Sequence, residues 1–143
     1  MKRLRGFSLL ELLVVISIMA LATAGVALSL RDSGQSQLER EAQRLSALLE
    51  AGRAQARASG TLVRWQAQAQ GPGFRFEGLP ADNSLPTQWL DAGTRVAEGS
   101  VLVLGPEPLL PPQRTVLTHI DTPELRVSVA TDGLRPFAPG GRP

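Results

Sequence analysis

The feature that constrains this chain most is an uninterrupted apolar run near its N-terminus. From Leu12 to Leu30 the sequence contains no charged residue. These 19 residues would form a helix about 28 Å long, close to the thickness of the hydrocarbon layer of a bilayer. Lys2, Arg3 and Arg5 precede the run. The pattern predicts a membrane-spanning helix with a cytoplasmic N-terminus and the body of the chain on the other side.

A carboxylate at the start of this region distinguishes it from an ordinary signal peptide. Inside a bilayer Glu11 would cost about 2.5 to 3.5 kcal/mol, so it requires a partner or a position close to the interface. Ala22-Thr23-Ala24 matches the A-x-A pattern of signal peptidase sites, and cleavage after Ala24 would release a secreted soluble domain. Glu11 and the apolar residues that continue beyond Ala24 argue against this alternative.

Composition narrows the classes of function. The chain has no cysteine and one histidine, His119, which excludes disulfides, cysteine zinc sites and multi-histidine metal sites. Without the three cations ahead of the apolar run, 12 basic and 13 acidic residues remain, so net charge indicates no general nucleic-acid surface. The sequence lacks the motifs of serine hydrolases, zinc proteases and phosphate-binding loops. We therefore expect no enzyme, no metal and no cofactor.

Residues 31–60 show the spacing of an amphipathic helix. Its apolar stripe follows alternating steps of four and three: Leu38, Ala42, Leu45, Leu49, Gly52 and Ala56. Charged residues, including Glu41 and Arg53, occupy the rest of the helix surface. Gly60 fits the position of a helix stop.

After Gly60 the period of the pattern changes from helix to strand. Val63, Trp65 and Ala67 alternate with polar residues, and "FRFEG" returns as the second strand of a hairpin. Later strand candidates are Val101–Leu104, Thr115–Ile120 and Leu125–Thr131. We expect a loop over residues 79–94 and a frayed tail in "APGGRP". The fold class is therefore α+β, a long N-terminal helix with a membrane-spanning half and an amphipathic half, packed on a small antiparallel β-sheet domain.

The stretch "KRLRGFSLLELLVVISIMALATAG" resembles the class III leader of type IV pilins and of the pilin-like proteins of type II secretion. The resemblance implies cleavage by prepilin peptidase after Gly6, methylation of the new N-terminal amine of Phe7, and pairing of Glu11 with that amine in a neighbouring subunit to set register. It divides the chain into a leader at 1–6, a transmembrane and filament-core helix at 7–30, an amphipathic helix at 31–60 and a periplasmic antiparallel β domain at 61–143.

The soluble part is similar to the H-type minor pseudopilins of type II secretion, the GspH family. The similarity lies in "LEREAQRLSALLEAGRAQARASGTLVRW", "GFRFEG" and "VSVATDGLRPF". It implies a β-sandwich against the long helix, in a single-pass inner-membrane protein that joins a periplasmic pseudopilus. The implied partners are other pseudopilins, major and minor, prepilin peptidase and the inner-membrane assembly platform.

A related alternative is a minor pilin of a type IV pilus that acts in DNA uptake. Arg126, Arg135 and Arg142 could supply phosphate contacts, but they fall on a strand, in a turn and in the tail. Solvated arginines are the simpler interpretation, and we expect no nucleic-acid partner. Several carboxylates are scattered singly and predict no calcium site: Asp82, Asp91, Glu98, Glu107, Asp121 and Glu124.

Overall fold

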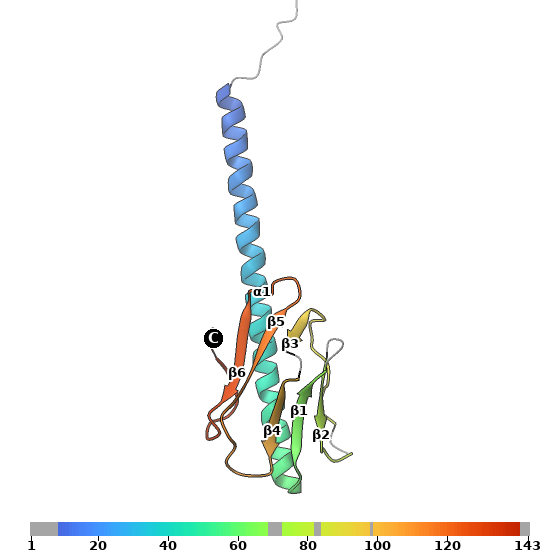
Figure 1. Cartoon of the computed structure of the whole chain (residues 1–143). Helices are drawn as coiled ribbons and strands as arrows, with labels where there is room; N and C mark the ends of the chain where they lie inside the picture. Colours follow the sequence, from blue (N-terminus) through green and yellow to red (C-terminus); the bar gives the residue numbers. More distant parts are fainter. Residues whose placement is uncertain (1–8, 69–72, 82–83, 98, 141–143) are drawn as a thin grey trace, which may run out of the picture. The chain divides into compact units, whose positions relative to one another are not determined.

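In the part of the chain that the structure describes, one long helix is followed by seven strands (Figure 1). The computed structural model describes residues 9–68, 73–81, 84–97 and 99–140, and for residues 26–33 it describes the backbone alone. Helix α1 covers Leu9–Ser59, and Gly60 follows it with a φ of 66°, a left-handed conformation common where helices end. The chain divides into two compact units, Met1–Ser33 and Gly34–Pro143.

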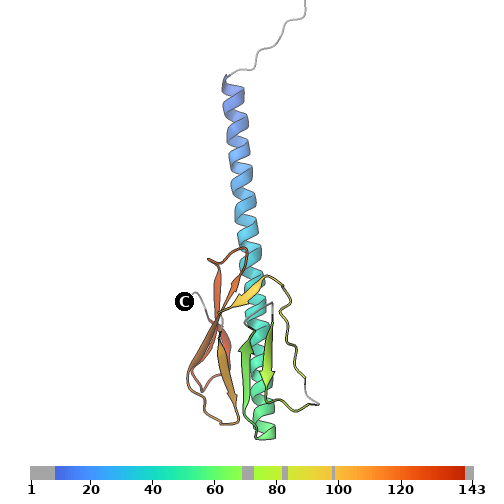
Figure 2. The same cartoon turned by 45° about the vertical axis from the view of Figure 1, so that its right-hand side comes forward.

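The strands form two antiparallel sheets beside the part of α1 that belongs to the second unit (Figures 1 and 2). One sheet has the order β2-β1-β4 and the other β3-β5-β6-β7. Their bounds are β1 Val63–Ala67, β2 Phe74–Glu77, β3 Thr94–Val96, β4 Val101–Gly105, β5 Gln113–His119, β6 Arg126–Thr131 and β7 Ala138–Gly140. The predicted α+β class, a long N-terminal helix packed on antiparallel β structure, is confirmed.

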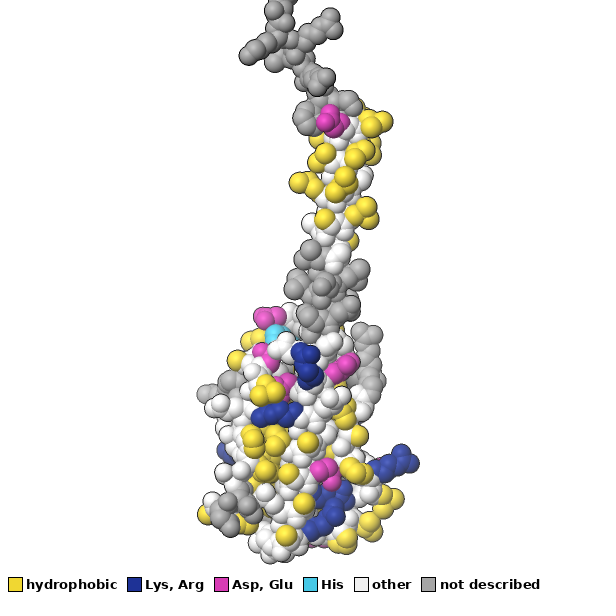
Figure 3. Space-filling view, turned by 180° about the vertical axis from the view of Figure 1, so that it is seen from behind, with side chains coloured by type: hydrophobic (Ala, Val, Ile, Leu, Met, Phe, Trp, Pro, Cys, Tyr) yellow, Lys and Arg dark blue, Asp and Glu magenta, His cyan; other side chains and the backbone are white. Residues whose placement is uncertain are grey.

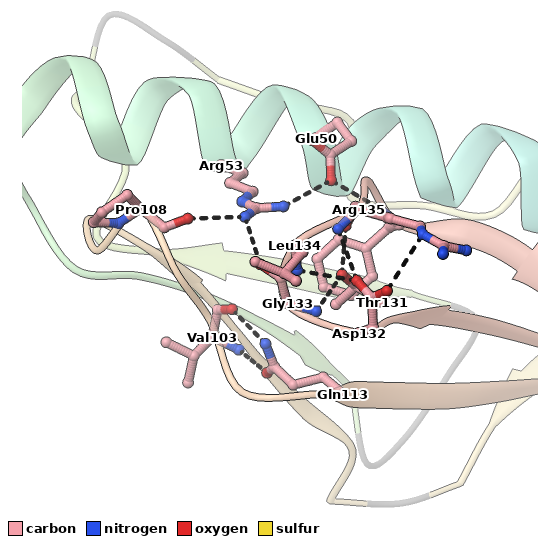
Figure 4. Close-up of polar contacts among 11 residues, drawn as sticks. Glu50, Arg53, Val103, Pro108, Gln113, Thr131, Asp132, Gly133, Leu134 and Arg135 are labelled. Carbon is pink, nitrogen blue, oxygen red and sulfur yellow. Dashed lines mark hydrogen bonds and ion pairs between the residues drawn. The ribbon is translucent and has the colours of Figure 1, made fainter.

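A side-chain amide joins the two sheets. Gln113 at the start of β5 accepts a hydrogen bond from the Val103 backbone N–H at 2.7 Å and donates one to the Val103 carbonyl at 2.9 Å. The amide therefore satisfies the Val103 N–H and carbonyl on the edge of β4 that faces away from β1, as a neighbouring strand would. Figure 4 shows this pair of bonds below the loops that approach α1.

The hydrophobic core lies between α1 and the sheets. Every predicted stripe residue of the amphipathic half is buried, and Leu45, Leu49 and Ala56 are at most 1 % exposed. A Cβ at Gly52 would lie 2.9 Å from the Leu104 side chain, so a glycine lets the sheet approach the helix at this point. An aromatic cluster completes the core, in which the centroids of the Phe74 and Trp89 rings lie 4.6 Å apart with the rings tilted by 58°.

Two short strands differ from the prediction. The expected loop at 79–94 ends in β3, whose first residue Thr94 is 1 % exposed, and the tail expected to fray forms β7 over Ala138–Gly140. β7 pairs with β6 through Ser128↔Gly140, while residues 141–143 lie outside the described residues. The frayed-tail prediction is therefore wrong for residues 138–140, because pairing with the preceding strand β6 holds a segment whose own sequence has no strand pattern.

Candidate functional site

The predicted processing site lies at the N-terminal end of the chain. Gly6 and Phe7 lie outside the described residues, so cleavage and methylation there stay predictions. Glu11 is exposed in the first turn of α1, where the partial positive charge of a helix N-terminus favours a carboxylate. Its role in setting subunit register also stays a prediction.

The helix segment on both sides of Glu11, residues 9–21, presents an apolar surface. The large apolar side chains between residues 9 and 21 have exposed fractions from 41 % at Val15 to 82 % at Leu9. On the face seen in Figure 3, hydrophobic side chains cover most of this segment. A surface of this kind requires cover by lipid or by apolar surfaces of other chains.

Within the described residues, no helix combines the length and the apolar character that a membrane crossing requires. The predicted span at 7–30 also includes residues 7 and 8 and the side chains of residues 26–30, which lie outside the described residues.

Glu41, which the sequence pattern places on the polar surface of the helix, is 2 % exposed. Its Oε1 accepts hydrogen bonds from the backbone N–H groups of Leu90 at 2.6 Å and Asp91 at 3.1 Å. Arg44, one turn further along α1, lies 3.6 Å from Glu41 Oε2 and donates to the Gln88 carbonyl at 3.0 Å. The prediction for Glu41 is wrong because backbone donors of a distant loop replace water around its carboxylate.

Arg53 is the second buried charge of α1, at 3 % exposure (Figure 4). Its Nη2 donates to the carbonyls of Pro108 and Gly133, each at 3.2 Å, and its Nη1 lies 3.7 Å from Glu50 Oε1. The same Glu50 oxygen accepts the Phe137 N–H at 2.9 Å. The placement of Arg53 on the polar surface is therefore also wrong, because its guanidinium binds the two loops that flank β5 and β6.

The single histidine also has a structural position. His119 Nε2 lies 2.8 Å from Asp91 Oδ2, and Nδ1 accepts the Asp121 N–H at 3.1 Å. This pattern places the proton of the neutral ring on Nε2. Its ring lies against Gly93, where any side chain would clash, so His119 ties the end of β5 to the loop before β3.

The structure does not gather the arginines considered for DNA binding. Arg126 begins β6, whereas Arg135 follows the other end of that strand and pairs with Asp132 at 3.5 Å. A strand of six residues is about 17 to 20 Å long, so the two side chains start far apart. Arg142 lies outside the described residues, as do Asp82 and Glu98. Among the residues that are described, no three His, Asp or Glu side chains form a group that would hold a metal.

The helical period predicts the apolar stripe but not the burial of Glu41 and Arg53, the two residues of α1 that bind loop backbone. The sequence gives one indication that these two side chains are buried, because each is next to a residue of the predicted apolar stripe. Glu41 precedes Ala42, and Arg53 follows Gly52. Such positions lie at the border of the buried face, where a long polar side chain reaches loop backbone.

Comparison with known proteins adds one finding at the N-terminus. Residues 1–27 match the family described as the prokaryotic N-terminal methylation motif. No curated protein and no solved structure matches this chain. The chain thus carries the N-terminal methylation motif of type IV pilin-like proteins at residues 1–27, which include the first part of the long helix of its α+β fold.

Proposed function

We propose that the protein is a minor pseudopilin of a type II secretion system. Prepilin peptidase cuts after Gly6 and methylates Phe7, and the mature chain is a single-pass inner-membrane protein with a periplasmic C-terminal domain. It then joins the pseudopilus with other pseudopilins, major and minor, on the inner-membrane assembly platform. The observation that carries this proposal is the methylation motif at residues 1–27, whose helical part presents an exposed apolar surface over residues 9–21.

The proposed work of the chain is mechanical, with no enzymatic activity. The buried charges of α1 bind backbone groups of the chain itself, Glu41 at Leu90 and Asp91, and Arg53 at Pro108 and Gly133. These groups hold loops in place, which suits a subunit whose surface must keep one shape in a filament.

A minor pilin of a type IV pilus is the second candidate, since the same motif serves both assemblies. The wide separation of Arg126 and Arg135 gives its DNA-uptake form little support. The third candidate, release of a soluble domain after Ala24, requires cleavage at residues that lie inside α1.

Mass spectrometry of the mature N-terminus tests the processing step. The full chain, expressed in a host with prepilin peptidase, should begin at N-methylated Phe7, and Gly6→Leu should block cleavage. Gly25→Leu is the matched control, because a side chain at Gly25 meets no atom within 4 Å in the described structure. A mature protein that begins at Gly25 would contradict the proposal.

Glu11→Ala tests assembly separately from processing. We expect normal membrane insertion and at least a tenfold lower yield in sheared filaments, because the carboxylate partner of the neighbouring N-terminus is lost. Ser17→Ala serves as control, since Ser17 bonds only the Leu13 carbonyl one turn away in α1 among the described residues. Complementation of a secretion-defective strain, compared with a pilus-defective strain, separates the two filament candidates.

A further inference from the structure

The turn between β5 and β6, residues 119–125, is fixed at both ends. At its start, Ile120 N–H donates to the Gly93 carbonyl at 2.9 Å. At its end, Leu125 is 2 % exposed, and a Cβ at Gly34 of α1 would lie 3.3 Å from the Leu125 Cδ1. The turn is therefore fastened to the loop before β3 and to α1, and its middle is held separately.

His119 holds the middle of this turn through one ring nitrogen. Its Nδ1 accepts the Asp121 N–H at 3.1 Å, and its Nε2 lies 2.8 Å from Asp91 Oδ2. A neutral imidazole has one N–H and one acceptor nitrogen. The form protonated at Nε2 makes both bonds, so the neutral ring binds the backbone of the turn on one side and the Asp91 carboxylate on the other.

A second proton changes what the ring can bind. It can be added only at Nδ1, because Nε2 already carries one, and the imidazolium then has two donors and no acceptor. The bond from the Asp121 N–H is therefore lost. The carboxylate of the same residue can replace it, because Asp121 Oδ2 lies 3.9 Å from Nδ1 and this side chain is 84 % exposed. A movement of about 1 Å would give the length of a charge-assisted hydrogen bond.

The charged groups near the ring are mostly carboxylates. Asp91 faces it from the loop before β3 and Asp121 from the turn, where Glu124 is also exposed. On α1, Glu41 accepts the Asp91 N–H at 3.1 Å, and Arg44 lies 3.6 Å from Glu41 Oε2. A positive ring would thus lie between two carboxylates.

The two arginines of the neighbouring strands lie on the other face of the sheet. Strand register places both Arg95 of β3 and Arg126 of β6 opposite Thr118 of β5. Successive side chains of a strand point to opposite faces, so His119, the next residue, points away from both arginines. Neither of them therefore opposes a positive charge on the ring from its own face.

We propose that His119 is a pH-sensitive latch of the β5–β6 turn: the neutral ring binds the Asp121 N–H, and the imidazolium releases it and binds the Asp121 carboxylate. Histidine is the side chain whose charge usually changes between about pH 5 and 8, so mild acidification would open the latch. The Asp121 carboxylate is exposed in the first state and paired in the second. The latch therefore changes the charge that the turn presents, whatever assembly the chain joins.

NMR of the full chain in detergent micelles, labelled with nitrogen-15, tests the latch from pH 8 to pH 5. His119 is the one histidine of the sequence, so its ring signals identify themselves. At pH 8 the ring should be neutral with its proton on Nε2. On acidification the ring and the Asp121 amide should shift with the same midpoint, and protection of this amide against hydrogen exchange should fall about threefold to tenfold. The Val103 amide, which is bound to the uncharged Gln113 side chain, is the internal control and should not shift.

Three variants separate a latch from a purely structural role. His119→Gln keeps a donor for Asp91 but cannot titrate, so the Asp121 amide should become independent of pH in this range. Asp121→Asn keeps the backbone N–H and removes the carboxylate that pairs with the imidazolium, so the ring midpoint should move to lower pH. Glu107→Gln removes an exposed carboxylate from the loop between β4 and β5 and should leave the midpoint unchanged. Circular dichroism confirms that each variant is folded.

Three results in the natural chain would each overturn the latch: a ring that stays neutral at pH 5, a neutral ring with its proton on Nδ1, or an Asp121 amide that does not follow the ring. An unchanged ring midpoint in Asp121→Asn overturns it as well, and this variant decides if His119→Gln does not fold. Processing at Gly6 plays no part in these measurements, so the latch and the proposed function fail separately.

Discussion

At the scale of single residues, buried charges fasten the β domain to α1. Glu41 reaches backbone donors 49 and 50 residues away, and Arg53 reaches carbonyls 55 and 80 residues away. Hydrogen bonds between an ionised side chain and a backbone group are about twice as strong as neutral ones. Two side chains thus bind the backbone of three loops to α1, beside the buried apolar side chains that these loops contribute.

Replacement of Arg53 by Met should lower the free energy of unfolding by about 2 to 3 kcal/mol, because the carbonyls of Pro108 and Gly133 lose their donor while the apolar stem is kept. Urea unfolding followed by tryptophan fluorescence measures the change. Arg57→Met, one turn further along α1, removes an exposed arginine and should cost well under 1 kcal/mol. Equal losses in both variants would show that the two loop contacts contribute nothing.

The apolar stripe of α1 could be predicted residue by residue because burial on a helix follows its period of 3.6. Burial of Glu41 and Arg53 could not be predicted in this way. Their partners are backbone groups in loops, and backbone groups are identical in every residue and leave no sequence pattern. The N-terminal site is the opposite case, because the methylation motif is local and lies within residues 1–27, while the roles of Gly6, Phe7 and Glu11 in it stay predictions.

At the scale of elements, the Asp132 carboxylate caps backbone N–H groups in the turn between β6 and β7. The Asp132 carboxylate accepts the N–H groups of Arg135 at 2.7 Å and Leu134 at 3.0 Å. These bonds, first that from Arg135 and then that from Leu134, hold the pKa of Asp132 below its usual value, and the Arg135 charge adds to the effect. The ionised form of Asp132 therefore favours the folded state.

The lowered pKa of Asp132 determines how the stability of the folded state changes with pH. Because the folded pKa lies below the unfolded value of about 3.9, the stabilisation is complete above that pH and disappears as the pH falls through the folded pKa. Asp132→Asn should be less stable than the natural chain at pH 6, and this difference should shrink as the pH falls below about 3.9. Urea unfolding at a series of pH values checks this. A difference that stays constant with pH would point to lost packing instead.

Strands with clear alternation could be predicted, and the shortest could not. Val63, Trp65 and Ala67 are all buried in β1, as their alternation indicates. β3 and β7 have three residues each, too few to show a period of two. β7 also contains Pro139. Proline is tolerated in a strand mainly at the edge of a sheet, and β7 is an edge strand of its sheet.

At the scale of the whole molecule, the hydrophobic core belongs to the unit Gly34–Pro143. All its members lie between Leu38 and Phe137, and the apolar segment before Gly34 contributes none of the described core residues. A fragment of residues 34–143 should therefore fold by itself. We expect a cooperative thermal transition and a near-ultraviolet circular dichroism signal from the buried Trp65 and Trp89.

A fragment that begins at Ser46 is the matched comparison for this prediction. It keeps all the strands but lacks Leu38, Ala42 and Leu45, and it also loses the Glu41 contact with the 90–91 backbone. Removing one large buried apolar side chain costs about 2 to 5 kcal/mol, so the loss of two buried leucines and of the Glu41 contact is comparable with the 5 to 15 kcal/mol that usually holds a domain together. We expect no cooperative transition from the shorter fragment. If the 34–143 fragment also unfolded without cooperativity, its core would depend on the apolar N-terminal segment, and the second unit would not be an independent domain.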